Sequence, residues 1–385
     1  MPLPDKYELP AAADFHVHVR DGPMSAAVVP TIRQGGVNVA YVMPNLVPPV
    51  TTVKMAVEYK ERLLKIDSNV TYLMTLYLHP SITPEVVREA KKAGIAGIKS
   101  YPAGLTTNSE SGVTDYEQFY PVFAAMEEEG LILNIHGECA SDHKKNITIM
   151  NAEASFLPTL KEIHTKFPKL KIVLEHCTTA DAVKAVEACG DTVVGTITAH
   201  HLFLIVDDWA GDVFHYCKPV AKMPNDRLAL LRAAVTSKGK FFLGTDSAPH
   251  DISAKKGKGN TAAGVFTQPY AVAYVLTALE EAVARGDIEE GQVTQELLEG
   301  FLGGFGRAFY GVEASKERIV AEKKDEVVVE SIKGEGIEVV PFRKGKPTWS
   351  VRWLVDRGMN HFTIDRAGGH TECKRPNTAR RKLLL

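Results

Sequence analysis

Eight short apolar runs, separated by segments of helical pattern, constrain the fold of this chain more than any other feature. Most of the runs are nearly continuous rather than alternating, as expected for parallel strands that are covered on both faces. They cover residues 11–18, 37–44, 70–78, 95–102, 131–137, 171–177, 193–200 and 240–246. The segments between them predict helices over residues 52–65, 83–93, 115–129, 154–166, 179–189 and 225–238.

Eight strand–helix units over about 250 residues predict an α/β fold of the (β/α)8, or TIM, barrel type. The alternative is an open, doubly wound sheet. That fold is disfavoured because no Gly-x-Gly-x-x-Gly sequence follows the first run.

The pattern changes near Glu326, where short β-prone runs begin at 327–329, 337–340 and 349–353. We expect a small C-terminal strand appendage, so that residues 1–353 form the barrel with this appendage. The last fifteen residues hold five basic residues and one acidic residue. Residues 354–385 are therefore predicted to form a basic, disordered tail.

The overall composition excludes several classes of protein. The net charge of −2 gives no field that would attract nucleic acid or an anionic membrane. Five cysteines, without a Cys-x-x-Cys pair, argue against a disulfide framework and a thiolate zinc site. No secretory signal or membrane-spanning run is visible. We expect a soluble, cytoplasmic protein whose partner is a small molecule, and the sequence leaves a homodimer open.

Polar side chains recur where these runs end. The first run carries His16 and His18, which point to one face because side chains alternate along a strand. Further candidates lie toward the ends of the fourth, fifth, sixth and eighth runs, namely Lys99, His136, His176 and Asp246. In a barrel these ends meet at one mouth, where the chemistry takes place. Imidazole and carboxylate groups gathered there predict a metal site.

Lys99 needs its own explanation, because an ammonium does not bind a divalent metal. A desolvated lysine could form a Schiff base with a carbonyl substrate, as in an aldolase. Alternatively, its neutral amine could react with CO₂ to give a carbamate whose oxygens bridge two metals. Four histidines and an aspartate nearby favour the carbamate, since a Schiff-base enzyme has no use for them.

With these residues in place, the chain resembles the dihydroorotases of the shorter, stand-alone type in the amidohydrolase superfamily, and the fungal members most. The matching stretches are FHVHVRDG (15–22), VMPNLVPPVTT (42–52), GIKSYPAGLTTNSESGVT (97–114), IHGE (135–138), LEHCTTADA (174–182) and GTDSAPH (244–250). Together they are specific for this family, whereas the His-x-His pair alone indicates only the superfamily.

The resemblance implies a reaction and a role for each matching residue. The reaction is the reversible, zinc-dependent cyclisation of N-carbamoyl-L-aspartate to L-dihydroorotate in de novo pyrimidine biosynthesis. The implied ligands are His16, His18 and Asp246 for one zinc, His136 and His176 for the other, and N6-carboxylated Lys99 as the bridge. Asp246 would also be the catalytic proton shuttle. The implied substrate contacts are Arg20, Asn45 and His250 at the carboxylate, Thr106 and Thr107 in a mobile loop, and the backbone of Ala263.

Two other functions remain as alternatives. A dihydropyrimidinase acts on rings without a carboxylate, so Arg20 with Asn45 and His250 argues against it. A non-catalytic barrel scaffold would be expected to lose metal ligands, and this chain retains them.

Some nearby features are interpreted more plainly. Lys218 replaces an apolar residue of the bacterial relatives, and its effect depends on whether its side chain enters the pocket. The basic stretch 255–259 is interpreted as a solvated loop, and His200 and His201 as residues that support the metal ligands or the structure. Cys177 and Glu175 are expected to face away from the metal ligands.

Overall fold

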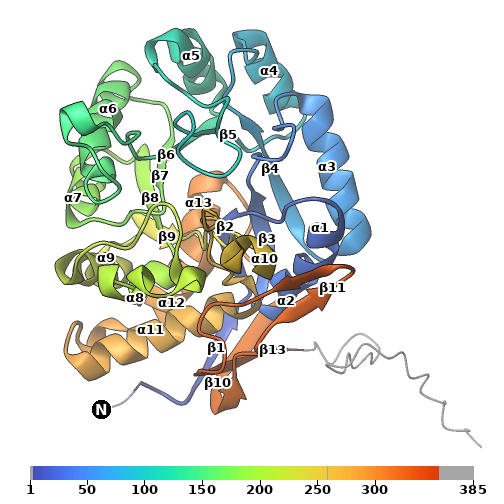
Figure 1. Ribbon diagram of the computed structural model, residues 1–385, viewed down its shortest axis with the longest axis vertical. Helices are drawn as coiled ribbons and strands as arrows, with labels where there is room; N and C mark the ends of the chain where they lie inside the picture. Colours follow the sequence, from blue (N-terminus) through green and yellow to red (C-terminus); the bar gives the residue numbers. More distant parts are fainter. Residues whose placement is uncertain (1–2, 258, 355–385) are drawn as a thin grey trace, which may run out of the picture. The chain divides into compact units, whose positions relative to one another are not determined.

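The computed structural model describes residues 3–257 and 259–354. Its centre is a parallel sheet of eight strands, in which each strand pairs with the next along the chain (Figure 1). The strands are β2 (Ala12–Val17), β3 (Val37–Val42), β4 (Thr71–Tyr77), β5 (Gly97–Ser100), β6 (Ile132–His136), β7 (Ile172–Glu175), β8 (Val193–Ile197) and β9 (Phe241–Leu243). A parallel bridge between Val17 and Ser247 nearly closes the sheet. The predicted (β/α)8 barrel is confirmed, and each of the eight predicted runs contains one strand.

Helices surround the sheet, and the six that were predicted are present (Figure 1). The α-helices are α1 (Gly22–Val28), α2 (Pro30–Gln34), α3 (Val53–Ile66), α4 (Pro84–Lys92), α5 (Tyr120–Glu129), α6 (Ala152–Lys166), α7 (Ala180–Ala188), α8 (Val206–Ala210), α9 (Pro224–Thr236), α10 (Ile252–Lys256), α11 (Ala271–Arg285), α12 (Gln295–Glu299) and α13 (Phe305–Tyr310). Short helical turns lie at η1 (Glu117–Phe119), η2 (His143–Lys145), η3 (His200–Leu202), η4 (Val213–His215), η5 (Gln268–Tyr270), η6 (Glu290–Gln292) and η7 (Gly300–Gly304). No helix in the described ranges is long and apolar enough to cross a membrane.

Threonine caps set several of the turns from strand to helix. The side chains of Thr52, Thr83 and Thr179 each accept a hydrogen bond from the backbone N–H three residues later. Such caps satisfy an N–H that the first helical turn leaves without a partner. The loops that carry the polar residues are therefore held at their helical ends.

The barrel interior is apolar at one end and polar at the other. Side chains of β2, β3, β6, β7, β8 and β9 form an inner core, against which α13 packs. Within it, the rings of Phe15 and Tyr310 stack with centroids 4.8 Å apart. The N-terminal end of the barrel is thereby filled. A cavity can open only at the C-terminal ends of the strands, as is usual for this fold.

The strand appendage differs from the prediction in extent. It begins at Arg318 rather than near Glu326, and β10 (Arg318–Val327) pairs antiparallel with β1 (Lys6–Pro10) and β13 (Pro347–Trp353). A hairpin of β11 (Ile332–Gly334) and β12 (Ile337–Val339) lies between β10 and β13 in the chain. The charged composition of β10 conceals it, and β1 becomes a strand only through a partner about 310 residues away. The tail was predicted over residues 354–385, and all of it after Leu354 lies outside the described residues.

Candidate active site

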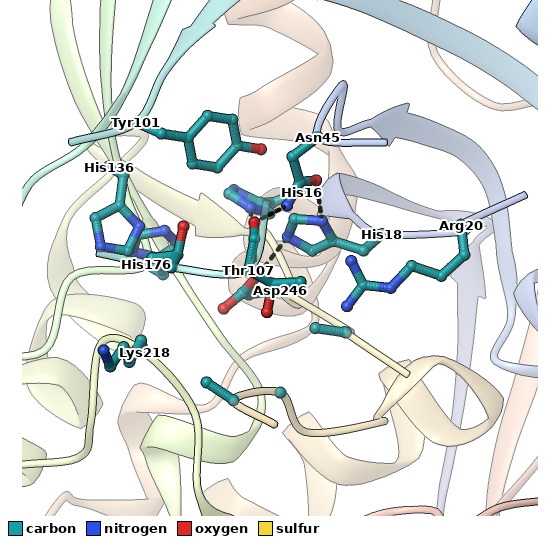
Figure 2. A pocket seen from close by; sticks show the side chains of 14 residues that line it. His16, His18, Arg20, Asn45, Tyr101, Thr107, His136, His176, Lys218 and Asp246 are labelled. Carbon is teal, nitrogen blue, oxygen red and sulfur yellow. Dashed lines mark hydrogen bonds and ion pairs between the residues drawn. The ribbon is translucent and has the colours of Figure 1, made fainter. Parts of the chain in front are cut away.

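A pocket opens at the C-terminal ends of the barrel strands (Figure 2). Ten of the predicted site residues line it, namely His16, His18, Arg20, Asn45, Thr106, Thr107, His136, His176, Asp246 and Ala263. The other lining residues are Tyr101, Lys218, Ala248 and Gly264, which were not predicted as site residues. Of the remaining predictions, Lys99 is fully buried and is not among the lining residues, and His250 contacts the lining residues Arg20 and Ala263. The structure thus brings the predicted set together, while the roles of its members stay predictions.

Three of these residues form a compact group of metal-ligating atoms. Asp246 Oδ1 lies 3.1 Å from His18 Nε2 and 3.4 Å from His16 Nε2. All three side chains are buried, and their ligand atoms lie within 4.8 Å of one another. Two nitrogens and an oxygen at this spacing can hold one divalent cation.

A second pair of imidazoles lies beside this group. The rings of His136 and His176 have centroids 4.6 Å apart, and the His176 ring lies 5.0 Å from that of His16. His136 Nε2 is 2.8 Å from Glu138 Oε2, which leaves Nδ1 as the nitrogen available to a ligand. Burial lowers the pKa of both histidines, so both rings are neutral and able to bind a metal.

Lys99 is a buried group whose charge acts on histidines of both sets. Its side chain is fully buried, and Nζ has no hydrogen-bond partner among the described residues. Burial lowers the pKa of Lys99 to about 8, although Glu175 and Asp246 oppose this shift. A buried amine without an acceptor is costly as an ammonium, and its neutral form can react with CO₂.

Strained backbone carries three of the pocket residues. Arg20, His176 and Asp246 have φ values of 57°, 42° and 48°, in the left-handed region that non-glycine residues rarely adopt. Each lies just past the end of a strand, where the chain leaves the regular alternation. Backbone strain of this kind clusters at functional sites, where the surrounding structure enforces it. This geometry could not be deduced from the residue pattern.

The strain at His176 corrects one prediction. Alternation along β7 was expected to point Glu175 away from the ligands, but its carboxylate lies inside the barrel. Glu175 Oε2 is 2.8 Å from His16 Nδ1 and accepts a hydrogen bond of 2.6 Å from Thr196 Oγ1. The positive φ turns the side chain of His176 toward the mouth as well. Cys177 is buried in the outer apolar core, as expected.

Glu175 therefore fixes the ring of His16 with Nε2 toward Asp246. Replacing it with glutamine (Glu175→Gln) is expected to weaken metal binding about 10- to 100-fold, because outer partners of this kind orient a metal-bound histidine. Competition against a zinc indicator would measure this. Glu162→Gln, an exposed change on α6, is the control. Unchanged affinity would contradict the role given to Glu175.

The residues expected at the substrate carboxylate form a second group at the rim. Arg20 Nη2 lies 3.2 Å from His250 Nε2, and Arg20 Nε donates to Pro249 O at 3.1 Å. His250 Nε2 also lies 2.9 Å from Ala263 O. Burial, together with the charge of Arg20, lowers the pKa of His250 to about 3, so this ring is neutral. Arg20 thus supplies the positive charge at this end of the pocket.

A loop after β5 covers the pocket from the side of Asn45. Asn45 Oδ1 is 2.8 Å from His18 Nδ1, and its Nδ2 donates to Thr107 O at 3.0 Å. Asn45 was predicted to bind substrate, and here it joins a histidine to the loop. Across the pocket, Lys218 Nζ donates to Leu105 O at 2.8 Å. The Lys218 side chain therefore belongs to the pocket wall, and it holds the loop from the opposite side.

A further cluster of His200, His201 and Cys217 could be taken for another metal site. Two of its three members already have partners, because Cys217 Sγ donates to Pro219 O and His201 Nδ1 contacts Thr198 Oγ1. A metal-bound histidine normally donates its second ring N–H to an acceptor. His200 Nδ1 has no partner among the described residues. This supports the structural role predicted for the two histidines.

Comparison with known proteins finds relatives that match most of the chain. An amidohydrolase family profile matches residues 75–207. The chain is 52% identical over 349 residues to a probable dihydroorotase of Schizosaccharomyces pombe, covering 90% of this chain and 99% of the relative. It is 46% identical over 366 residues to the dihydroorotase of Saccharomyces cerevisiae, covering 90% and 98%.

A solved structure extends the similarity to three dimensions. The crystal structure of dihydroorotase from Saccharomyces cerevisiae in complex with 5-fluoroorotic acid aligns with a TM-score of 0.84 and 44% identity. The alignment covers 91% of this chain and 99% of the other. Three observations agree on the family: the barrel is of the same type, the relatives match over nearly their whole length, and the pocket contains the predicted residues. The chain belongs to the dihydroorotase family of amidohydrolases.

Proposed function

We propose that this enzyme interconverts N-carbamoyl-L-aspartate and L-dihydroorotate. The observation that carries the proposal is a single pocket that joins a metal-ligating group to a carboxylate-binding end. The metal-ligating group includes His16, His18 and Asp246, and the carboxylate-binding end is centred on Arg20. Both substrates are amides that carry a carboxylate, so they need both ends. A metal-dependent assay with each substrate, in each direction, tests the proposal.

The residues in this pocket fit two zinc ions, and the ligands would be those that the family resemblance implies. The donors are imidazole and carboxylate groups, which suit zinc, and the orphaned amine of Lys99 fits a bridging carbamate. When bound, two zinc ions would polarise the substrate carbonyl and lower the pKa of water to near neutrality.

Asp246 is the residue placed to move the proton. Burial raises the pKa of its carboxyl, although His16 and Lys99 oppose this shift. In ring opening, Asp246 accepts the proton of the attacking water and gives it to the departing amide nitrogen. In ring closure the transfer is reversed: Asp246 accepts the proton from the amide nitrogen and gives it to the oxygen that leaves as water.

Arg20 would distinguish dihydroorotate from rings without a carboxylate. Arg20→Met should raise KM for dihydroorotate about 100-fold with a smaller change in kcat, because a charge-assisted pair to the carboxylate is lost. Steady-state kinetics would measure both constants. Arg62→Met, on the exposed face of α3, is a matched control. A parental KM for the Arg20 variant, or efficient turnover of dihydrouracil by the parent enzyme, would favour the dihydropyrimidinase alternative.

The remaining proposals concern the setting of the enzyme. We place it in the cytoplasm, in de novo pyrimidine biosynthesis, and a homodimer is the assembly to test by sedimentation. The scaffold alternative is not favoured by full-length relatives that are named dihydroorotases. Metal analysis of the purified protein would distinguish the two alternatives further, because the enzyme should contain two zinc ions per chain and a scaffold should not.

A further inference from the structure

A buried ammonium lies behind the outer wall of the pocket. Lys255 is only 4% exposed, although its neighbours Ala254 and Lys256 are exposed, and its Nζ donates to three backbone carbonyls. The acceptors are Tyr216 O at 3.0 Å, Ala262 O at 2.8 Å and Gly264 O at 2.8 Å. These three bonds use all three N–H groups of the ammonium. The stretch 255–259 was expected to be a solvated loop, which is wrong for Lys255.

The three acceptors belong to two segments that both line the pocket. One segment, 216–218, contributes Lys218, and the other, 262–264, contributes Ala263 and Gly264. The segments are also joined directly, since Gly264 N donates to Tyr216 O at 3.0 Å. Burial lowers the pKa of Lys255 to about 8, which leaves the group mainly protonated at pH 7. Its charge therefore strengthens each of the three bonds.

On the pocket side, the second segment has little room to move. Ala263 O is 2.9 Å from His250 Nε2. A Cβ atom placed on Gly264 would lie 2.3 Å from Ala248 O and 2.7 Å from His250 Cδ2. Displacement of 262–264 would therefore displace His250, which contacts Arg20. The position of the Lys255 ammonium is thus transmitted to the rim of the pocket.

We propose that Lys255 is a positioning residue that sets the carboxylate-binding end of the pocket. By holding the carbonyls of Tyr216, Ala262 and Gly264 around one point, it fixes where Ala263 and His250 meet the substrate. That the ligand is dihydroorotate rests on the function proposed above. The carboxylate end does not react, so its contacts are the same in the ground state and the transition state. Losing their alignment raises KM rather than lowering kcat.

The test compares Lys255→Met with Lys256→Met, a change of the same kind at the adjacent exposed lysine. For Lys255→Met we expect KM for dihydroorotate to rise about tenfold, with kcat within about threefold of the parent value. We also expect faster amide hydrogen exchange in a peptide that covers 262–266, because Gly264 N–H loses its support. Lys256→Met should match the parent in both measurements.

Each outcome decides the matter. A parental KM for Lys255→Met, or a fall in kcat with KM unchanged, overturns the proposal. If this variant does not fold, Lys255→Arg replaces it, because a planar guanidinium cannot place three donors on the same carbonyls. A raised KM then supports the proposal and a parental KM overturns it. If the parent enzyme does not turn over dihydroorotate, the proposed function fails, and the exchange comparison alone decides whether Lys255 holds the wall.

Discussion

Asp246→Asn should lower kcat about 10³-fold, within the range that a positioned acid–base group contributes. The amide oxygen of asparagine can still approach His16 and His18, where Asp246 Oδ1 now lies at 3.4 and 3.1 Å. It cannot accept and return a proton in the way that a carboxylate does. Zinc content should therefore stay near that of the parent enzyme while turnover is lost. Steady-state kinetics and metal analysis on the same preparation would measure the two effects.

Two comparisons make this result specific. Asp181→Asn, on the exposed face of α7, removes a carboxylate of the same type far from the pocket and should leave kcat unchanged. Loss of zinc in step with activity would show that Asp246 matters only as a ligand. Near-parental turnover by Asp246→Asn would remove it from the proton pathway altogether.

Changes at Lys99 should lower activity by as much, and the activity of the parent enzyme should depend on CO₂. Enzyme stripped of metal by a chelator and given zinc in CO₂-free buffer should recover little activity until bicarbonate is added, because the bridging carbamate cannot form without it. Lys99→Met should lose about 10³-fold or more in activity under either condition, since under the proposed function both metals would lose a shared ligand. Activity recovery against bicarbonate concentration is the measurement.

An independent signal separates the carbamate from a general effect on folding. In enzyme supplied with ¹³C-bicarbonate, carbon NMR should show a bound carbamate in the parent and none in Lys99→Met. Lys171→Met changes an exposed lysine at the start of β7, away from the mouth, and should keep the signal. Recovery that ignores bicarbonate would leave Lys99 as a buried amine with another purpose.

The barrel could be predicted because its strands are buried on both faces and so read as continuous apolar runs. Residues such as His16 and Lys99 could be located because strand ends meet at one mouth. The small sheet was harder, since β1 becomes a strand only by pairing with β10 at the other end of the described chain. Long-range pairing of charged strands leaves almost no local signal.

The misassigned residues share a different cause. Glu175 and His176 are adjacent, and alternation forbids both from pointing inward unless the backbone leaves the strand, as the φ of 42° at His176 shows. Lys255 lies in a basic, glycine-containing stretch that resembles a solvated loop. Its burial depends on three carbonyls from distant segments. Neither the backbone strain nor the position of these carbonyls can be predicted from the residue types alone.

The two side-chain bonds of Asn45 have a consequence for how the loop and the metal site are coupled. One end of the amide contacts His18 and the other donates to the carbonyl of Thr107, so the loop and a proposed metal ligand share one side chain. If the closed loop strengthens metal binding by some factor, thermodynamic linkage requires that bound metal favour the closed loop by the same factor. Metal binding and closure of the loop are then coupled. In the metal-free enzyme, the loop should spend less time closed over the pocket.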